Sequence, residues 1–298
     1  MKEIKLANIE NIANNQSVIN NVKRKTEFID TVSFVDDYPL FSWIDINPTE
    51  LCNMLCDFCP RSDPNSYPNQ ALHMSSFLFE KIGAELKELN YQGAVTLSGY
   101  GEPLLHPEIA KIPAMFDKTT KVEIVTNGKT LTPELINQMI SNGLDYFVVS
   151  MYEGEFQREI FLNMFQEAGI DESSYALRDR WYDADEGYGI KLTNRAGVTN
   201  VGNQLEVDPT AQCFYPHYSM TIDWNGDVLL CMQDWNKRVK FGNLYSQSLF
   251  EIWSSPKLNK YRNALAQGKR KLSPCNNCNA NGRVHGYNHA LAFEARKN

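Results

Sequence analysis

Residues 52–59 read Cys-Asn-Met-Leu-Cys-Asp-Phe-Cys and place three thiols, Cys52, Cys56 and Cys59, in one short stretch. The run before it, residues 41–46, alternates apolar and polar side chains and predicts a strand, so the thiols lie on the loop that leaves this strand. Thiolates are soft ligands that suit iron–sulfur clusters, zinc or copper(I). With no fourth Cys or His nearby, the loop is one ligand short of a closed tetrahedral site. A cluster bound by three cysteines keeps one iron open for a small molecule.

The composition excludes several classes of protein. The chain has 298 residues, of which 43% are hydrophobic, enough for one large domain or a large and a small one. Its net charge of −7 offers no basic surface to a nucleic acid, so we expect neither DNA nor RNA as a partner. The N-terminus lacks the apolar core of a signal peptide, and no run of about 18 apolar residues could span a bilayer. We expect a cytoplasmic protein without a membrane partner, whose seven cysteines bind metal rather than form disulfides.

Beyond residue 40, strand patterns alternate with helical patterns, which is typical of a parallel sheet with crossover helices. Residues 1–40 show no clean period and predict an irregular or partly helical extension. The sequence predicts strands at residues 41–46, 93–97, 121–125, 146–150 and 189–192, and helices at residues 77–86 and 106–116, from residue 132, and at 156–168.

Several of the loops that follow these strands carry residues suited to ligand binding, and in α/β proteins the ligand lies at that edge of the sheet. Residues 98–103 read Ser-Gly-Tyr-Gly-Glu-Pro, in which Gly101 permits close backbone approach and Glu102 offers one carboxylate to an ammonium group. Thr126 and Asn127 follow the next strand, and Ser150 ends the one after it. Each of these short patterns is also compatible with an ordinary turn.

A guanidinium group follows the last predicted strand of this region. Arg195 stays charged at any physiological pH and presents donors in a fixed fork that suits a carboxylate or a polyol. We therefore place Arg195 first among the residues expected to contact the substrate, with catalysis as its candidate role.

The C-terminal part of the chain carries the other four cysteines. Residues 219–224 and 227–231 alternate around Asn225-Gly226, a strong signal for a hairpin with a two-residue turn. A helical segment follows over residues 248–265. The thiols arrive as two pairs, one across the hairpin and one as C-x2-C, and they form a full tetrahedral set for a [4Fe–4S] cluster or for zinc: Cys213, Cys231, Cys275 and Cys278.

The spacing C-x3-C-x2-C, with Phe58 before the last Cys, resembles the cluster loop of the radical S-adenosylmethionine (AdoMet) enzymes. Residues 100–103 resemble the GGEP segment of that family, with Tyr100 in place of its first Gly. C-x17-C, with Gly226 five residues before its second Cys, followed by a helix and C-x2-C, resembles the auxiliary-cluster module of the SPASM/twitch subfamily in its shorter twitch form.

This resemblance implies a partial (β/α)6 barrel with a C-terminal twitch-type domain built from a β-hairpin and a helix. It divides the chain into an N-terminal extension (residues 1–40), the barrel (41–203) and the auxiliary-cluster domain (204–298). It also implies AdoMet and two [4Fe–4S] clusters, one AdoMet-binding and one auxiliary. The implied AdoMet contacts are Phe58 on adenine, Gly101 and Glu102 at the amino group, and Thr126, Asn127, Ser150 and Arg195 at the ribose or carboxylate.

Three cysteines for the first cluster and four for the second use all seven, so no thiol is left to return a hydrogen atom to a substrate radical. This favours an oxidation in which the 5′-deoxyadenosyl radical abstracts hydrogen and the auxiliary cluster accepts the second electron. We predict an oxidoreductase that converts an alcohol of a small polyol, sugar or nucleotide sugar to a ketone, with a flavodoxin- or ferredoxin-type electron donor. The alternatives are a sugar epimerase or dehydratase, a peptide-modifying enzyme, and a non-catalytic iron–sulfur or zinc protein.

Overall fold

The computed structural model describes residues 16–181 and 192–296. Its main element is an eight-stranded sheet with the order β10-β9-β8-β3-β4-β5-β6-β7. The strands from β8 to β7 in this order run parallel, whereas β9 and β10 extend the sheet in antiparallel fashion. The parallel strands are β3 (Trp43–Ile46), β4 (Ala94–Leu97), β5 (Lys121–Thr126), β6 (Tyr146–Met151), β7 (Tyr175–Asp179) and β8 (Ser219–Ile222).

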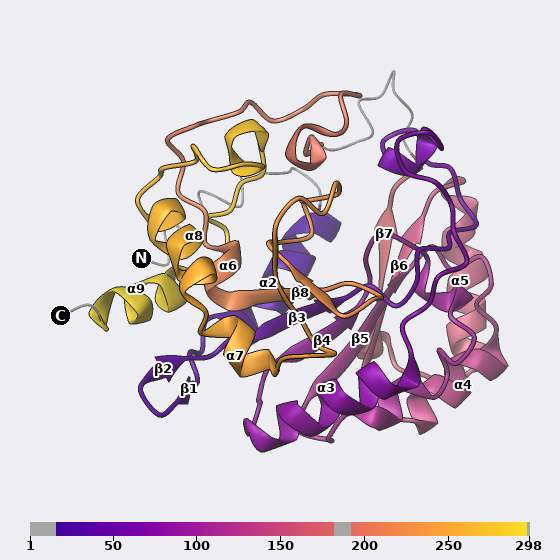
Figure 1. Ribbon diagram of the computed structural model, residues 1–298. Helices are drawn as coiled ribbons and strands as arrows, with labels where there is room; N and C mark the ends of the chain where they lie inside the picture. The colour runs from indigo at the N-terminus through magenta and orange to yellow at the C-terminus, as the bar shows by residue number, and fades with distance from the viewer. Residues whose placement is uncertain (1–15, 182–191, 297–298) are drawn as a thin grey trace.

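Helices cover the outer face of this sheet. In Figure 1 they follow its lower and right margins as α3 (Ser76–Glu88), α4 (Pro133–Ser141) and α5 (Phe156–Glu167). The side chains of Ser75 and Thr132 cap α3 and α4 by accepting hydrogen bonds from backbone N–H groups of the first turn. Parallel strands with covering helices confirm the predicted α/β class and its partial barrel.

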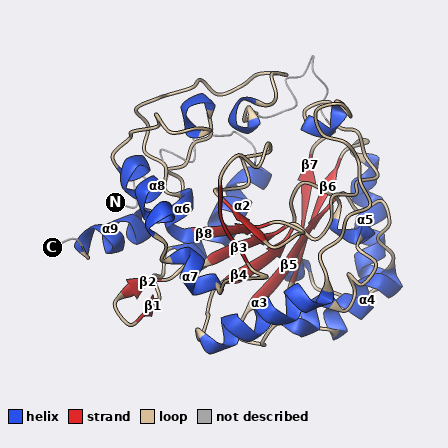
Figure 2. Cartoon of the chain, viewed as in Figure 1, coloured by secondary structure: helices blue, strands red, loops and turns tan. Residues whose placement is uncertain are grey.

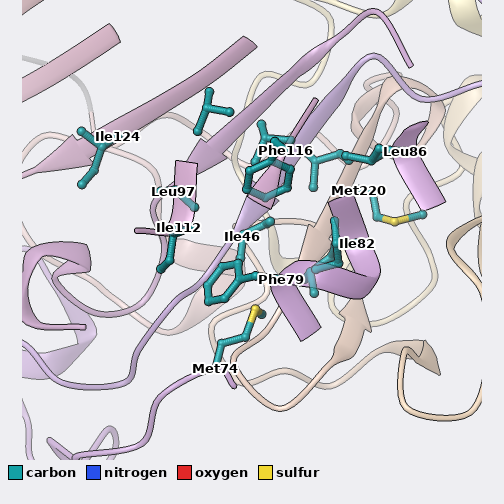
Figure 3. Packing of buried hydrophobic residues seen from close by; sticks show 14 of the residues in the cluster. Ile46, Met74, Phe79, Ile82, Leu86, Leu97, Ile112, Phe116, Ile124 and Met220 are labelled. Atoms are coloured by element: carbon teal, nitrogen blue, oxygen red, sulfur yellow. The ribbon is translucent and has the colours of Figure 1, made fainter. Parts of the chain in front are cut away.

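Each parallel strand sends alternate side chains to the two faces of the sheet. Figure 3 shows Ile46 and Leu97 from the strands beside Phe79 and Ile82 of α3, all of them fully buried. Burial of one such side chain contributes roughly 1.5–3 kcal/mol. The intervening residues, such as Asp45, face the concave side and line a cavity.

The C-terminal segment extends the sheet with β9 (Asp227–Leu229) and β10 (Lys240–Asn243). The turn between β8 and β9 has three residues rather than the predicted two, because the N–H of Asp223 bonds the carbonyl of Asp227. Gly226 ends the turn with a φ of 81°, which a side chain would strain. Figure 2 shows the remaining helices beside β8, away from α4 and α5: α6 (Tyr215–Tyr218), α7 (Leu249–Trp253), α8 (Pro256–Ala266) and α9 (Tyr287–Ala295).

The N-terminal helix α2 (Gln16–Ile29) packs against the concave face of the sheet. Arg24 forms an ion pair with Glu123 of β5, and the ammonium group of Lys25 lies 4.1 Å from the centre of the Trp43 ring. A two-stranded hairpin, β1 (Phe34–Val35) and β2 (Tyr38–Pro39), leads from α2 into the sheet. The extension before residue 41 thus contributes one wall of the cavity.

Some predicted elements differ from the structure. Residues 106–116 form no α-helix but belong to a loop with 3-10 turns at Pro103–Leu105 and Ile112–Met115, because prolines within it lack the N–H that a helix needs. The single helix predicted over residues 248–265 is two helices, with Pro256 beginning the second one. The sequence pattern does not predict β7, and most of the strand predicted at 189–192 lies outside the described residues.

The two cysteine-containing regions share one sheet. Trp43 of β3 pairs with Ala94 of β4 on one side and with Ser219 of β8 on the other. The domain limits at residues 40 and 203 stay predictions, but the pairing shows that the segment after 203 completes the sheet of the segment before it. None of the helices within residues 16–181 and 192–296 has the length and apolar character that crossing a bilayer requires.

Candidate active site

A cavity of about 580 Å³ opens on the concave side of the sheet, and it includes the loops that follow the parallel strands. It collects most of the site residues that the sequence predicts. Those that line it are Cys52, Cys56, Phe58, Cys59, Gly101, Glu102, Thr126, Asn127, Ser150, Arg195 and Cys231. Cys213, Cys275 and Cys278 are not among the lining residues, and they gather around Cys231.

Glu102 is the most thoroughly fixed polar group in the cavity. Its carboxylate accepts hydrogen bonds from the Thr126 hydroxyl at 2.5 Å, the Asn127 N–H at 2.8 Å and the Leu104 N–H at 3.0 Å. Burial raises the pKa of Glu102, and these three donors oppose that shift. A buried carboxylate with fixed donors on one side suits a cationic partner on the other.

Two residues that the sequence places beside AdoMet also make contacts within the protein. Thr126 and the backbone of Asn127 bind Glu102, and the Asn127 amide also donates to Asn53 in the cysteine loop at 2.7 Å. Gly101 has no room for a side chain, because a Cβ atom there would lie 2.0 Å from the carbonyl oxygen of Thr49. Its small size serves packing against the protein's own backbone.

The first three thiols lie on a loop that side-chain hydrogen bonds fix in place. The amide of Asn69 clamps Cys52 by accepting from its N–H and donating to its carbonyl oxygen, both at 2.9 Å. Burial raises the pKa of Cys56 to about 12, and repulsion from Cys59 and Cys52 adds to this rise. The three sulfur atoms therefore lie close enough to interact electrostatically. None of the three forms a disulfide. Neighbouring unpaired thiols fit an iron–sulfur cluster, whose binding removes their protons.

A buried ionic network joins this loop to the C-terminal segment. Arg61 and Glu50 pair at 3.0 Å, Lys237 and Asp223 pair at 2.6 Å, and Lys237 also contacts Glu50. The Asn47 amide donates to Asp223 at 2.8 Å and accepts from the backbone of the Glu102 loop. Asp223 therefore joins the Glu102 loop, through Asn47, to Lys237 of the C-terminal segment.

The other four thiols form a second set. Burial raises the pKa of Cys213 to about 11 and that of Cys275 to about 12, and neighbouring thiols of the set contribute to both shifts. Backbone N–H groups point at three of the sulfur atoms, as they do around thiolate ligands of iron–sulfur clusters: at Cys213 from Tyr215, at Cys231 from Gln233 and at Cys278 from Ala280. The set fits a four-thiolate cluster.

Arg195 lies on a strained turn between the two thiol sets. Arg195 and Ala196 have φ angles of 49° and 54°, in the left-handed region that non-glycine residues rarely adopt. Asn194 fixes this turn, since its side chain donates to the Asn277 carbonyl at 2.7 Å and its N–H donates to the Asn279 side chain at 2.7 Å. The C-x2-C loop thus positions the Arg195 guanidinium, which lies 5.9 Å from the Trp235 ring centre.

Tyr100 is the residue at which this chain differs from the family's GGEP segment. Its buried ring packs edge-on against Trp235, with ring centres 4.9 Å apart, and its N–H donates to Asn47. Trp235 follows Cys231 in the second thiol region. The aromatic side chain therefore joins the Glu102 loop to the region that carries the second set.

Comparisons with known proteins agree with this geometry. Residues 46–160 match the model of the radical SAM superfamily, and residues 213–279 match the SPASM iron–sulfur cluster-binding domain. The chain thus contains a radical SAM domain and a SPASM domain. These domains imply iron–sulfur clusters and AdoMet as cofactors, and the two thiol sets and Glu102 are the groups of the cavity region that could bind them.

Known relatives of this radical SAM protein include an enzyme of similar length. This chain is 27% identical over 245 residues to the S-adenosyl-L-methionine-dependent 2-deoxy-scyllo-inosamine dehydrogenase of Niallia circulans. The match covers 80% of this chain and 93% of the relative. The crystal structure of BtrN in complex with AdoMet and 2-DOIA has a TM-score of 0.70 and 26% identity, covering 84% of this chain and 98% of that one. A GTP 3′,8-cyclase of Chlorobaculum tepidum is 26% identical over 140 residues, covering 45% of this chain and 39% of the relative.

Sequence reasoning missed several cavity residues of this radical SAM protein. Arg178 lies on the unpredicted strand β7, and Arg180 follows it. Tyr152 stacks on Phe58 with ring centres 6.0 Å apart, so Phe58 is one half of an aromatic wall. Lys25 comes from α2, in a segment without a clear sequence pattern. Only the alternation around Arg178 in residues 175–179 offered a sequence signal.

Proposed function

We propose that this chain is a radical SAM dehydrogenase that oxidises an alcohol of a small polyol, sugar or nucleotide sugar to a ketone. Its cofactors are AdoMet and two [4Fe–4S] clusters, one at each thiol set. The observation that carries the proposal is that a single cavity contains the three-cysteine loop, Glu102 and Cys231 of the second set. The dehydrogenase of Niallia circulans, which matches most of the chain, supports an alcohol as the reacting group.

When bound, the first cluster and AdoMet supply a 5′-deoxyadenosyl radical that takes a carbon-bound hydrogen atom, and the second cluster supplies an acceptor for one electron. Loss of a hydrogen atom, an electron and the hydroxyl proton converts a secondary alcohol to a ketone, so atoms and charge balance. The side chains of this protein bind AdoMet, hold the substrate in the cavity and stabilise charge as the proton leaves.

Glu102 binds the amino group of AdoMet in this proposal. Its three protein donors lie on both carboxylate oxygens and fix the plane of the group, so it meets a cation without reorganising. Phe58, stacked on Tyr152, provides the surface for adenine. Ser150 accepts a hydrogen bond from Arg178 at 2.9 Å and orients that guanidinium in the cavity.

Arg195 is assigned to the substrate oxygen. The turn that carries it is clamped to the C-x2-C loop, and its guanidinium lies near Cys59, where its charge opposes the rise in pKa that burial causes. A fixed cation at this place stabilises negative charge on the substrate oxygen as its proton leaves. Arg195 therefore acts by charge stabilisation, and solvent takes the proton.

Epimerisation is the second candidate function. It requires a group that returns a hydrogen atom to the substrate, and a tyrosine can do so where no thiol is free. Tyr152, Tyr215 and Tyr218 line the cavity, which is the observation that favours this reading. An epimerase yields an inverted alcohol and no ketone, so product analysis separates the two functions.

The test is anaerobic reconstitution followed by metal counting and turnover. We expect about eight irons per chain and no zinc, as two [4Fe–4S] clusters require. With AdoMet and dithionite, which replaces the proposed flavodoxin- or ferredoxin-type donor, the protein should form 5′-deoxyadenosine, and the Cys56→Ala variant should not. Deuterium on the substrate carbon should appear in 5′-deoxyadenosine together with a ketone product.

The other outcomes are equally informative. About four irons with one zinc would remove the electron acceptor and turn the assignment toward the redox-neutral epimerase. Two intact clusters without AdoMet cleavage would refute the enzyme and leave an electron carrier.

A further inference from the structure

The lining of the cavity carries positive charge that the two thiol sets do not require. Four cationic side chains line the cavity without a carboxylate ion pair among the described residues: Lys25, Arg178, Arg180 and Arg195. Buried or enclosed cations without counter-charges are costly, so such a group indicates a ligand that completes it.

The clusters and AdoMet account for only part of this charge. Burial raises the pKa of Cys59 and of Cys213, and the charges of Arg195 and the paired Arg61 oppose the first rise. Arg270 opposes the second, so these three guanidinium groups lie near the thiol sets. The carboxylate of AdoMet can occupy one further cation, such as Arg180, which lies beside Tyr152 and Arg195. Lys25 and Arg178 remain.

Arg178 has a buried donor that no protein acceptor satisfies among the described residues. One terminal nitrogen donates to the Ser150 hydroxyl at 2.9 Å, whereas its buried Nε atom has no hydrogen-bond partner in the described part of the chain. A guanidinium stays charged even where burial lowers its pKa, as it does here. A hydroxyl group alone does not compensate that charge, but a phosphate or carboxylate would.

Lys25 brings a second cation to the same place from α2. Its ammonium group lies over the Trp43 ring, and burial lowers its pKa to about 8, with Arg24 and Arg178 adding repulsion. Asp45 is the one carboxylate that opposes this shift. It is already bound by the Trp43 ring N–H at 3.1 Å and the Ser219 hydroxyl at 3.2 Å.

We infer that the substrate carries an anionic group, a phosphate or a carboxylate, which binds between Lys25 of α2 and Arg178 of β7. The inference rests on the proposed function and narrows its substrate class. The anionic end contacts these two cations, and the alcohol to be oxidised faces the cluster loops. The substrate thus differs in charge from the amine that the name of the Niallia circulans relative denotes.

The test measures anaerobic binding to the reconstituted protein with AdoMet. The probes are myo-inositol, myo-inositol monophosphate, glucuronate and glucosamine, compared by titration calorimetry at constant ionic strength. We expect about tenfold to hundredfold tighter binding of the phosphate or the carboxylate probe than of the neutral one, the range that charge-assisted hydrogen bonds provide. The stronger of the two anions identifies the group.

Three variants locate the effect. Lys25→Gln and Arg178→Gln should each weaken anion binding about tenfold or more, and Arg178→Lys should restore part of it. Lys87→Gln is the matched control, because Lys87 is exposed on α3 and pairs only loosely with Asp117 at 3.8 Å. Wild-type affinity for the phosphate should fall as pH rises through about 8, where Lys25 loses its proton, and the Lys25→Gln variant should lack this step.

Equal affinity for neutral, cationic and anionic probes, or unchanged anion binding in both Gln variants, would overturn the inference. AdoMet cleavage with dithionite is measured in the same preparations. Absence of AdoMet cleavage in the wild type would refute the proposed function. Normal cleavage without a preference for anionic probes would refute the anion site alone.

Discussion

At the residue scale, the carboxylate of Glu102 shows how the site prepares a charge before its partner binds. The side chain is 3% exposed, and burial raises its pKa, yet its three donors include two backbone N–H groups that cannot move away. Thr126, the last residue of β5, and Asn127, which follows it, supply two of these contacts, and β5 is the strand next to β4. Neighbouring parallel strands thus position one carboxylate, and the part of this carboxylate that stays exposed faces the cavity.

We predict that Glu102→Gln weakens AdoMet binding about tenfold to hundredfold, because the amide keeps the size but loses the charge that meets the ammonium group. Equilibrium dialysis with labelled AdoMet measures the affinity, and the visible spectrum checks that iron content is unchanged. Glu108→Gln is the control, since Glu108 is a partly exposed glutamate that accepts from Ser76. Unaltered AdoMet affinity in Glu102→Gln would show that the carboxylate only holds its own loop.

At the scale of secondary-structure elements, α9 is attached to the sheet through a neutral histidine. His289 is fully buried, and a ring nitrogen lies 3.2 Å from the Ser42 hydroxyl, next to β3. Burial lowers the pKa of His289 to about 4, and the charge of Arg262 adds to this. When α9 opens, the ring regains an ordinary pKa of about 6.5 and takes up a proton that the packed form refuses.

Packing of α9 should therefore weaken as pH falls from about 6.5 toward 4. At pH 5 the loss is roughly 2 kcal/mol, or about thirtyfold in the opening equilibrium. Hydrogen exchange of the α9 amides at pH 7 and pH 5, corrected for intrinsic rates, measures it, with α4 as a helix that contains no histidine. The His289→Gln variant should lose the difference between the two pH values. A similar acid effect in that variant would exclude His289 as its source.

How well the sequence predicts an element depends on the local signals it carries. Ser75 and Thr132 cap helices with clear apolar periods, and both helices begin within one residue of their predicted start. The helix predicted over residues 106–116 is wrong, because the prediction followed the apolar period of this segment and disregarded its prolines. The sequence does not predict strand β7, because its residues are only partly buried and its alternation of apolar and polar residues is therefore weak. Arg178 was missed for this reason, although it lies in the cavity.

At the scale of the whole molecule, the two thiol regions meet through contacts that no local pattern reveals. β8 lies beside β3, although about half the chain separates them in sequence. The cysteine motifs predict both thiol sets because ligand spacing is local, whereas the network of Glu50, Asp223 and Lys237 depends on the completed sheet. The sequence therefore predicts the chemistry of each set but not the cavity that joins them.

This arrangement predicts that the second thiol set can be disabled without loss of the first. Cys275 lies in the C-x2-C loop outside the cavity lining, and the three-cysteine loop is held by Asn69 and Glu50, which the change does not touch. We expect the Cys275→Ser variant to retain AdoMet cleavage to 5′-deoxyadenosine but to form ketone at least about a hundredfold more slowly, since the electron that remains on the substrate carbon has no acceptor.

Chromatography of 5′-deoxyadenosine and of the ketone from one reaction measures both quantities, and iron analysis should show about half of the wild-type content. An unchanged far-ultraviolet circular dichroism spectrum excludes unfolding as the cause. Loss of both products would indicate that the second set supports the fold of the whole cavity. Ketone formation at the wild-type rate would refute electron transfer to that set. An inverted alcohol without any ketone, in the wild type and the variant alike, would instead make the cavity tyrosines and a redox-neutral reaction the better explanation of the site.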